Sequence, residues 1–293
     1  MFDLIQAGER TWYTDSPTII GIYQLDHSHV CLIDTGEGQA DALEIQNILD
    51  HKNWKLSFII NTHTHIDHLG GNDYLMSAWD CPAYSTNIGN AFANYEDMEA
   101  AYMYGGAPCG SLRKVFKHPG PIGFRDIEEF DLPEGLEYIL LPGHSFGMIG
   151  IKTSDNIWFV GDSVLNSKCL DKYQFGYLVD VQGYLDTLKL LEELEGALFI
   201  PSHGDVVTDI RPLARGNWDN IHKNGAYLLE ACKKGKLFDD LLKDVFDHYG
   251  MKGSLIQYAL AGSTLRCYLT WLHDLGKIGY AFEDNRMVWK TLL

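Results

Sequence analysis

The sequence has no apolar run long enough to cross a membrane, and its first residues lack the basic and apolar stretches of a secretory signal. Low-complexity tracts and internal repeats are also missing. We therefore expect a cytoplasmic protein that acts without a membrane partner.

Cysteine is scarce and scattered along the chain. There are six cysteines in 293 residues, and no two of them form a C-x-x-C pair. In a chain of this size, such spacing favours reduced, mostly buried thiols over a disulfide framework.

Positive charge is in short supply as well. Lysine and arginine total 23 against 40 aspartates and glutamates, which gives a formal net charge of −17. The deficit is uneven, because residues 1–210 carry 11 basic and 31 acidic side chains, whereas residues 211–293 carry 12 and 9. A strongly acidic body repels polyanions, so nucleic acid is disfavoured as a partner, although bound divalent ions would reverse the field locally. A role of this acidity in solubility alone is an equal alternative.

Length and composition indicate a globular protein. With 46% apolar residues, the chain can bury the core of one large domain or of two unequal ones. Because the candidate metal ligands described next all precede residue 210, we expect a catalytic domain over residues 1–210. Residues 211–293 would then form a separate, mostly helical subdomain.

The densest group of metal-binding side chains follows the apolar run 56–60, which predicts a buried strand. Its spacing is H-x-H-x-D-H, and the four side chains are His63, His65, Asp67 and His68. Imidazole and carboxylate groups are ligands of divalent metals, and four of them in one turn exceed what a single structural site needs. The absence of cysteine argues against a closed zinc-finger site. The pattern therefore predicts two neighbouring metal ions, and a polar loop that is rich in histidine by chance is the alternative.

Three further candidates each lie just past an apolar, strand-like run and beside glycine or proline. They are His144, Asp162 and His203. Side chains at the ends of several strands can converge on one rim of a sheet. Any one of them alone would be an ordinary loop residue, but together with the histidine-rich turn they indicate one shared site.

In sequence order, these motifs resemble those of the metallo-β-lactamase superfamily. The matching segments are THTHIDH (62–68), GH (143–144), GD (161–162) and SHG (202–204). The earlier LIDTG (32–36) resembles the first motif of that superfamily. The resemblance extends over about residues 15–210, and it implies an α/β fold of the αββα sandwich type.

The resemblance also implies a dinuclear metal centre. By position, one ion would take His63, His65 and His144, the other Asp67, His68 and His203, and Asp162 would bridge the two. The first expectation for both ions is zinc, with iron or manganese as alternatives. Asp34 would orient a ligand histidine, and its alternative role is that of a turn-forming residue.

Within the superfamily, Asp162 together with His203 resembles the glyoxalase II, lactonase and RNase Z branches. The β-lactamases that carry cysteine at the fourth motif are not matched, and the flavodiiron oxidoreductases typically have glutamate in place of His65. We expect hydrolysis of a thioester or lactone by a metal-bridging hydroxide, with Asp67 and Asp162 as the catalytic carboxylates. The alternatives are a phosphodiesterase or ribonuclease, a mono-iron enzyme like the persulfide dioxygenases, and a non-catalytic binding protein.

Two segments are candidates for the substrate pocket. Residues 91–104 are rich in aromatic residues and methionine and predict a helix that is either a lid or a packed element whose edge, with Tyr95, lines the pocket. Residues 166–177 would form a second wall. There Lys168 could hold an acidic substrate tail, and Tyr173 or Tyr177 could donate a hydrogen bond to an oxyanion. The alternative for the tyrosines is a satisfied, buried hydroxyl.

The C-terminal segment predicts helices over 213–234, 237–248, 255–260 and 263–275, followed by a hairpin around Asp284-Asn285. This order resembles a winged-helix module. Its role would be nucleic-acid contact or, as the small net charge favours, packing, pocket capping or dimerisation. The basic candidates for nucleic-acid contact are Arg266, Lys277, Arg286 and Lys290. We expect a small-molecule substrate, and a homodimer stays open. His118 is expected to be a surface loop residue.

Overall fold

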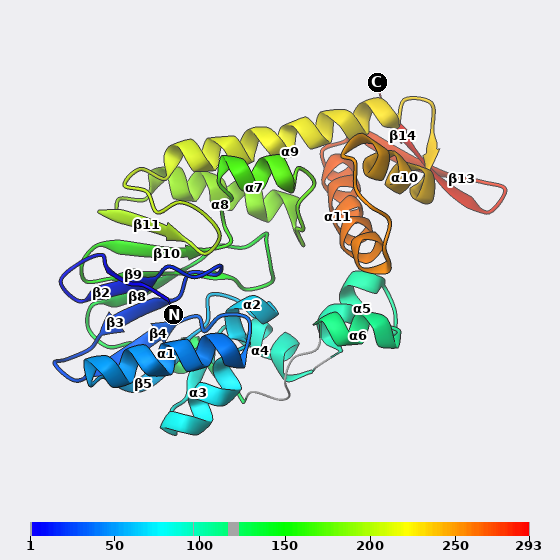
Figure 1. Ribbon diagram of the computed structural model, residues 1–293. Helices are drawn as coiled ribbons and strands as arrows, with labels where there is room; N and C mark the ends of the chain where they lie inside the picture. Colours follow the sequence, from blue (N-terminus) through cyan, green and yellow to red (C-terminus); the bar gives the residue numbers. More distant parts are fainter. Residues whose placement is uncertain (1, 96, 117–122, 293) are drawn as a thin grey trace.

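A computed structural model describes residues 2–95, 97–116 and 123–292, so His118 lies outside the described part. Two β-sheets pack face to face, and helices cover the outer surface of each sheet (Figure 1). This arrangement confirms the predicted αββα sandwich. Among the described residues, no helix is both long and apolar enough to span a membrane.

The first sheet has seven strands in the order of the sequence. They are β1 (Leu4–Gln6), β2 (Thr11–Thr14), β3 (Gly21–Gln24), β4 (His29–Ile33), β5 (Lys55–Ile60), β6 (Ala83–Ser85) and β7 (Arg125–Asp126). Strands β1 to β4 are antiparallel to their neighbours, whereas β4 to β7 are parallel. Because β4 and β5 are parallel, their carboxyl ends lie at the same edge of the sheet.

The second sheet has four strands in the order β11-β10-β9-β8. They are β8 (Leu136–Leu140), β9 (Ile149–Thr153), β10 (Ile157–Gly161) and β11 (Leu198–Pro201). Strand β9 is antiparallel to both β8 and β10, and β10 is parallel to β11. Strands β8, β10 and β11 therefore run in one direction, and their carboxyl ends also share an edge.

Buried side chains point alternately to the two faces of each sheet, as the pleat of a strand requires. On β4, Cys31 and Ile33 belong to the core between the sheets, whereas Val30 and Leu32 pack in a second cluster with the helices outside. Strand β10 divides in the same way. Since both faces of these strands are covered, their sequences are continuously apolar rather than alternating.

The outer helices extend the two outer cores. On the first sheet lie α1 (Gln39–Lys52) and α3 (Asn72–Trp79), and on the second α8 (Val181–Glu193) and α9 (Arg211–Ala231) (Figure 1). One hydrophobic cluster includes Leu188 on α8, Leu228 on α9 and Leu269 in the C-terminal region. The C-terminal helices therefore share a core with the second sheet, and the proposed division at residue 210 stays a prediction.

The C-terminal region is mostly helical, as predicted. After α9 come β12 (Lys236–Leu237), α10 (Phe238–His248), α11 (Leu255–Asp274), β13 (Ile278–Glu283) and β14 (Arg286–Thr291). The hairpin turns at Asp284 and Asn285, whose φ angles of 48° and 60° suit a tight two-residue turn. The predicted interruption between residues 260 and 263 is wrong, because α11 is continuous. A glycine inside a helix costs only about 1 kcal/mol, which the buried face of α11 offsets.

An insertion between β6 and β7 forms three short helices. They are α4 (Asn87–Asn94), α5 (Met98–Tyr104) and α6 (Gly110–Phe116). The prediction of one helix over 91–104 is wrong, because Tyr95 has an extended backbone with φ −116° and ψ 94°. Met103 and Leu112 of the insertion pack with Ala259 of α11. Helix α5 accordingly lies beside the end of α11 (Figure 1).

The loop after β8 packs closely against helix α8. Gly143 has a φ of +124°, and a Cβ atom there would lie 2.3 Å from backbone atoms of Tyr184 on α8. We expect Gly143→Ala to destabilise the protein by at least about 1–3 kcal/mol, because both the backbone conformation and the space exclude a side chain. Thermal unfolding followed by circular dichroism measures the effect.

Gly253→Ala is the matched control, since a Cβ at Gly253 meets nothing within 4 Å. Equal melting temperatures for Gly143→Ala and Gly253→Ala would contradict the packing described for this loop.

Candidate metal centre

Strand ends bring the predicted metal ligands to one edge of the sandwich. The segment with the H-x-H-x-D-H pattern follows β5 and includes the short helix α2 (Ile66–Leu69). His144 comes from the loop after β8, Asp162 directly follows β10, and His203 lies two residues past the end of β11. Because these strands end at the same edge, side chains up to 140 positions apart in sequence become neighbours.

The first group of donor atoms is formed by three imidazoles. His65 Nδ1 lies 3.0 Å from His63 Nε2 and 3.0 Å from His144 Nε2. An uncharged imidazole nitrogen carries either one proton or one lone pair, so His65 Nδ1 makes only one good hydrogen bond. One of the two 3.0 Å contacts of His65 Nδ1 is therefore not explained by hydrogen bonding. A cation bound by all three nitrogen atoms would explain both contacts.

The second group consists of Asp67, His68 and His203. Asp67 Oδ2 lies 3.0 Å from His203 Nε2 and 3.7 Å from His68 Nε2. The donor atoms of these three residues all lie within 4.8 Å of one another, as do those of the first group.

Asp162 lies between the two groups. Its Oδ2 is 3.3 Å from His144 Nε2 in the first group and 3.5 Å from His203 Nε2 in the second. Its Oδ1 is 3.5 Å from His68 Nε2. This is the position that the resemblance assigns to a ligand shared by two ions.

Two buried polar atoms test whether these residues fit a metal ion. His68 Nε2 and Asp162 Oδ1 are both buried and have no hydrogen-bond partner among the residues that the structure describes. A buried polar atom without a partner costs about 1–3 kcal/mol, and more when it is charged. A divalent cation satisfies both atoms at once, so the donor set fits a metal site.

Burial also keeps two of the histidines in the neutral form that binds metals. It lowers the pKa of His144 to about 3 and holds the pKa of His63 well below its usual value. Burial raises the pKa of Asp162, but the neighbouring His68 and His203 outweigh it and hold that pKa well below the usual range. Burial also lowers the pKa of His68 and of His203, but the charge of Asp162 outweighs it and raises both pKa values. Asp162 is thus ionised and His63 and His144 are neutral, as binding of a divalent ion requires, and a bound cation would displace the protons of His68 and His203.

Asp34 fixes the orientation of His68. Its carboxylate accepts hydrogen bonds from the backbone N–H and the hydroxyl of Thr62, at 2.7 and 2.8 Å, and its Oδ2 lies 2.9 Å from His68 Nδ1. His68 Nε2 then faces the donor cluster. A carboxylate behind a ligand histidine fixes its tautomer and raises its basicity.

Glu99 lies behind His65 in a similar way, and the sequence analysis missed it. Its side chain is buried, and its Oε1 lies 3.5 Å from His65 Nε2, on the opposite side of the ring from the donor cluster. Glu99 is the one charged residue of α5. A single acid within an apolar helix was the signal that could have found it.

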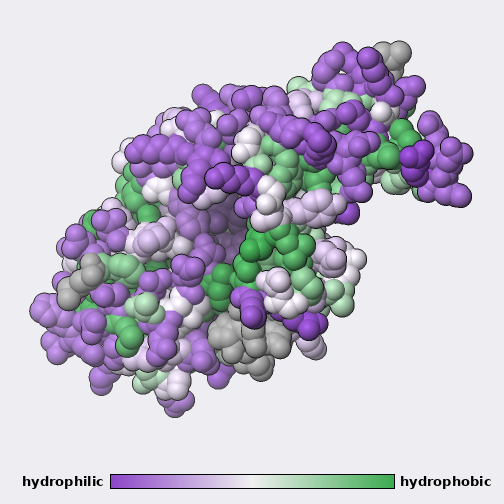
Figure 2. All heavy atoms as spheres, turned by 45° about the vertical axis from the view of Figure 1, so that its right-hand side comes forward, coloured by the Kyte–Doolittle hydropathy of each residue, from purple (hydrophilic) through white to green (hydrophobic). Residues whose placement is uncertain are grey.

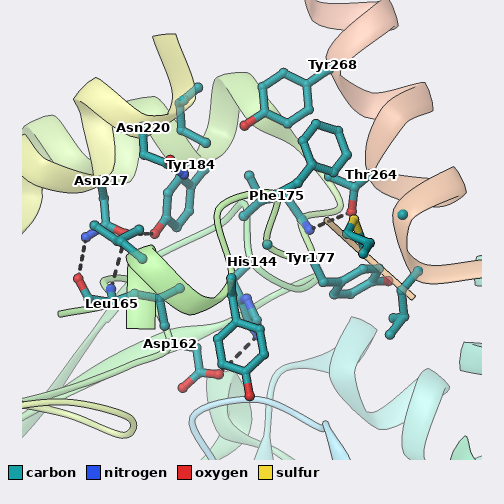
Figure 3. A pocket seen from close by; sticks show the side chains of 18 of the residues that line it. His144, Asp162, Leu165, Phe175, Tyr177, Tyr184, Asn217, Asn220, Thr264 and Tyr268 are labelled. Atoms are coloured by element: carbon teal, nitrogen blue, oxygen red, sulfur yellow. Dashed lines mark hydrogen bonds and ion pairs between the residues drawn. The ribbon is translucent and has the colours of Figure 1, made fainter. Parts of the chain in front are cut away.

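A cavity of about 220 Å³ begins at His144 and Asp162 and extends between α8, α9 and α11 (Figure 3). Two of the predicted pocket residues, Tyr173 and Tyr177, line it. In the space-filling view, the molecule has a hollow with hydrophilic walls, and hydrophobic side chains form part of its rim (Figure 2).

Tyr95 and Lys168 do not line this cavity. The side chain of Tyr95 is 65% exposed, because the chain turns outward where α4 ends. Lys168 is exposed on α7 (Ser167–Lys172), whereas Leu170 on the same helix faces the cavity. The prediction that Tyr95 and Lys168 line the pocket is therefore wrong for this cavity.

Comparison with known proteins agrees with this geometry. Residues 16–203 match the Metallo-beta-lactamase superfamily. The chain belongs to this superfamily. Members of the superfamily are metallohydrolases, and the chain has their fold and the His/Asp cluster that could bind metal.

Individual relatives are distant. The chain is 28% identical over 185 residues to the lactamase-like protein nscB of Aspergillus fumigatus, covering 61% of this chain and 46% of nscB. It is 27% identical over 187 residues to the thioesterase pkgB of Emericella nidulans, covering 61% of this chain and 44% of pkgB. The chain thus spans about half the length of these curated relatives.

The fold similarity extends further than the sequence similarity. A beta-lactamase domain protein from Burkholderia ambifaria superposes with a TM-score of 0.75 at 15% identity, covering 99% of this chain and 94% of that protein. At such low identity the likeness shows the fold alone, but it includes the C-terminal region.

The substitution Asp34→Asn tests whether the Asp34 carboxylate holds His68 in position to bind metal. Asp34 has a φ of 64°, a conformation that asparagine tolerates, so the substitution changes the acceptor without straining the backbone. We expect metal affinity to fall about 10–100-fold, because His68 loses its carboxylate partner. Competition with a chromophoric chelator measures the affinity.

Asp80→Asn is the matched control, since Asp80 is an exposed aspartate at the end of α3 with a φ of 49°. If both variants bound metal as tightly as the unmodified protein, the role assigned to Asp34 would be refuted.

Proposed function

We propose that this protein is a dinuclear metallohydrolase that hydrolyses a thioester or a lactone of a small molecule. The observation that carries the proposal is the convergence of seven side chains that could bind metal at one end of a partly open cavity, whose described lining includes no lysine or arginine. The metal-binding cluster supplies the chemistry of hydrolysis, and the cavity can hold the part of the substrate next to the bond that is cleaved.

Two divalent ions at this site, zinc in the first place, with iron or manganese as alternatives, would supply Lewis acidity and an activated water. The first would be held by His63, His65 and His144, and the second by Asp67, His68 and His203, with Asp162 shared. Because no serine or cysteine is required as nucleophile, the remaining residues need only position the substrate and handle protons.

Two residues are suited to these tasks. The side chain of Asp67 is 34% exposed, so solvent and substrate can reach it. Burial raises its pKa, but His203 and His68 outweigh burial and hold that pKa well below the usual range, so the carboxylate is ionised and would take a proton from the attacking water before passing it to the leaving group. Tyr177 lines the cavity with its ring 5.8 Å from that of His65. Burial raises the pKa of Tyr177 well above its usual value, so its hydroxyl keeps the proton and can donate a hydrogen bond to an oxyanion.

An acyl substrate is favoured by charge and by similarity. Among the described residues that line the cavity there is no lysine or arginine, so a phosphate group would have no cationic side chain to bind there. The acidic body of the protein also repels polyanions. The relative pkgB is named a thioesterase, which supports this choice.

A phosphodiesterase or ribonuclease is the second candidate. It is favoured by Lys277, Arg286 and Lys290, which are exposed on or beside the C-terminal hairpin. Arg266 does not add to this group, because its guanidinium lies 4.1 Å from the ring centroid of Phe238 and donates to the Gly262 carbonyl.

Parallel turnover assays test the proposal. Zinc-loaded protein is assayed on an acyl thioester, a lactone and a bis-aryl phosphate. We expect the thioester or the lactone to be turned over fastest, and Asp162→Asn to lose at least about 100-fold in kcat, because it removes the charge shared by both donor groups. Asp171→Asn, at an exposed aspartate on α7, is the control and should keep full activity.

Other outcomes of these assays, or of a metal analysis combined with an oxygen-uptake measurement, would overturn the proposal. Activity confined to the phosphate ester would favour the second candidate. One iron per chain, with oxygen uptake on a low-molecular-weight persulfide and no hydrolysis, would make the protein a dioxygenase instead.

A further inference from the structure

The far wall of the cavity comes from the C-terminal region. Figure 3 shows His144 and Asp162 at one end, and Thr264 and Tyr268 on α11 at the other. Helix α11 also contributes Leu260 and Ala261, and α9 runs along a third side. The sandwich supplies the metal-binding residues, whereas the C-terminal helices determine the shape of the space beside them.

This space offers almost no charge to a ligand. Among the described residues that line it, Asp162 is the only carboxylate and none is a lysine or arginine. Several of its neutral polar groups are already occupied by the protein. Asn217, for example, accepts from the Leu165 N–H and the Tyr184 hydroxyl and donates to the carbonyls of Leu165 and Leu213.

Two further polar groups show the same pattern. Thr264 Oγ1 accepts a hydrogen bond from Leu178 N–H, and Tyr268 Oη accepts one from the side chain of Asn224. With these atoms engaged, the surface left for a ligand is mostly that of Phe175, Leu260 and similar apolar side chains. An uncharged, apolar group is therefore the one that this cavity binds at least cost.

The volume of the cavity limits the size of the apolar group that it can hold. A protein cavity of about 150 Å³ lined by Leu, Ile and Phe binds benzene. The cavity here measures about 220 Å³, which is about half as large again. Two fused six-membered rings, or a chain of about eight carbon atoms, match this space, whereas an acetyl group would leave most of it empty.

The acyl side and the thiol side of a thioester are not equally suited to the cavity. Common biological thiol carriers are large and bear carboxylates or phosphates, and burying such charges without a cationic partner is costly. The thiol side is therefore left in the open cleft, and the acyl side occupies the cavity.

Resting on the proposed hydrolase function, we infer that the cavity selects an uncharged acyl group of about ten carbon atoms, such as a bicyclic aromatic acyl, and that α11 sets this limit. Ala261 is the residue through which the limit can be changed. It is 2% exposed, it lies on α11 and it lines the cavity.

The test is a series of N-acetylcysteamine thioesters with acetyl, butyryl, octanoyl, 2-naphthoyl and succinyl groups. We expect kcat/KM for the octanoyl and 2-naphthoyl substrates to exceed that for acetyl by at least about 100-fold, and succinyl to fall at least about tenfold below butyryl. Ala261→Phe should reduce kcat/KM for 2-naphthoyl at least about tenfold while changing that for acetyl less than about threefold.

Two further variants complete the design. Ala281→Phe, at an exposed alanine of β13, is the matched control and should leave the acyl preference unchanged. Ala261→Leu fills less space and replaces Ala261→Phe if the latter does not fold. Equal rates on acetyl and 2-naphthoyl, or a preference for succinyl, would overturn the inference.

A binding measurement separates this inference from the proposed function. Calorimetric titration with 2-naphthamide, a neutral compound that is not a thioester, should show binding to the unmodified protein and weaker binding to Ala261→Phe or Ala261→Leu. Binding without turnover of any thioester would refute the proposed hydrolysis alone. No binding of 2-naphthamide would refute the selection by the cavity, whatever the activity.

Discussion

The convergence of strand ends is the constraint on which the rest of this structure depends. Strands β4 and β5 of one sheet and β8, β10 and β11 of the other all end at the same edge of the sandwich. Imidazoles and carboxylates are thereby crowded to distances of 3.0–3.7 Å, partly out of contact with water. Such a cluster is costly without a counterion, so the fold itself creates the demand for bound cations.

The residues behind the donor cluster reduce the freedom of the ligands. Asp34 lies behind His68 and Glu99 behind His65, and the carbonyl of Pro17 lies 3.1 Å from His203 Nδ1. These supports come from the end of β4, from the loop between β2 and β3 and from the insertion helix α5. The metal-binding edge is therefore held from several directions, and α5 also connects it to α11, against which it packs.

Much of the site could be predicted from the sequence, because its key residues are marked by local patterns. The H-x-H-x-D-H segment lies within one turn, and Asp162 directly follows a buried run. Asn217 could not be found in this way, and the lone acid that marks Glu99 in an apolar segment does not show which histidine it lies behind, since the neighbours of a helical residue depend on how helices pack. The same limit explains why residues 91–104 were predicted as one helix and why Lys168 was placed in the pocket.

The central claim is that the seven side chains hold two cations side by side. The most direct measurement is a crystal structure of zinc-loaded protein with anomalous diffraction data collected on both sides of the zinc absorption edge. The account predicts two peaks, one among His63, His65 and His144 and the other beside His68 and His203, with Asp162 touching both. A single peak, or peaks remote from these residues, would contradict it.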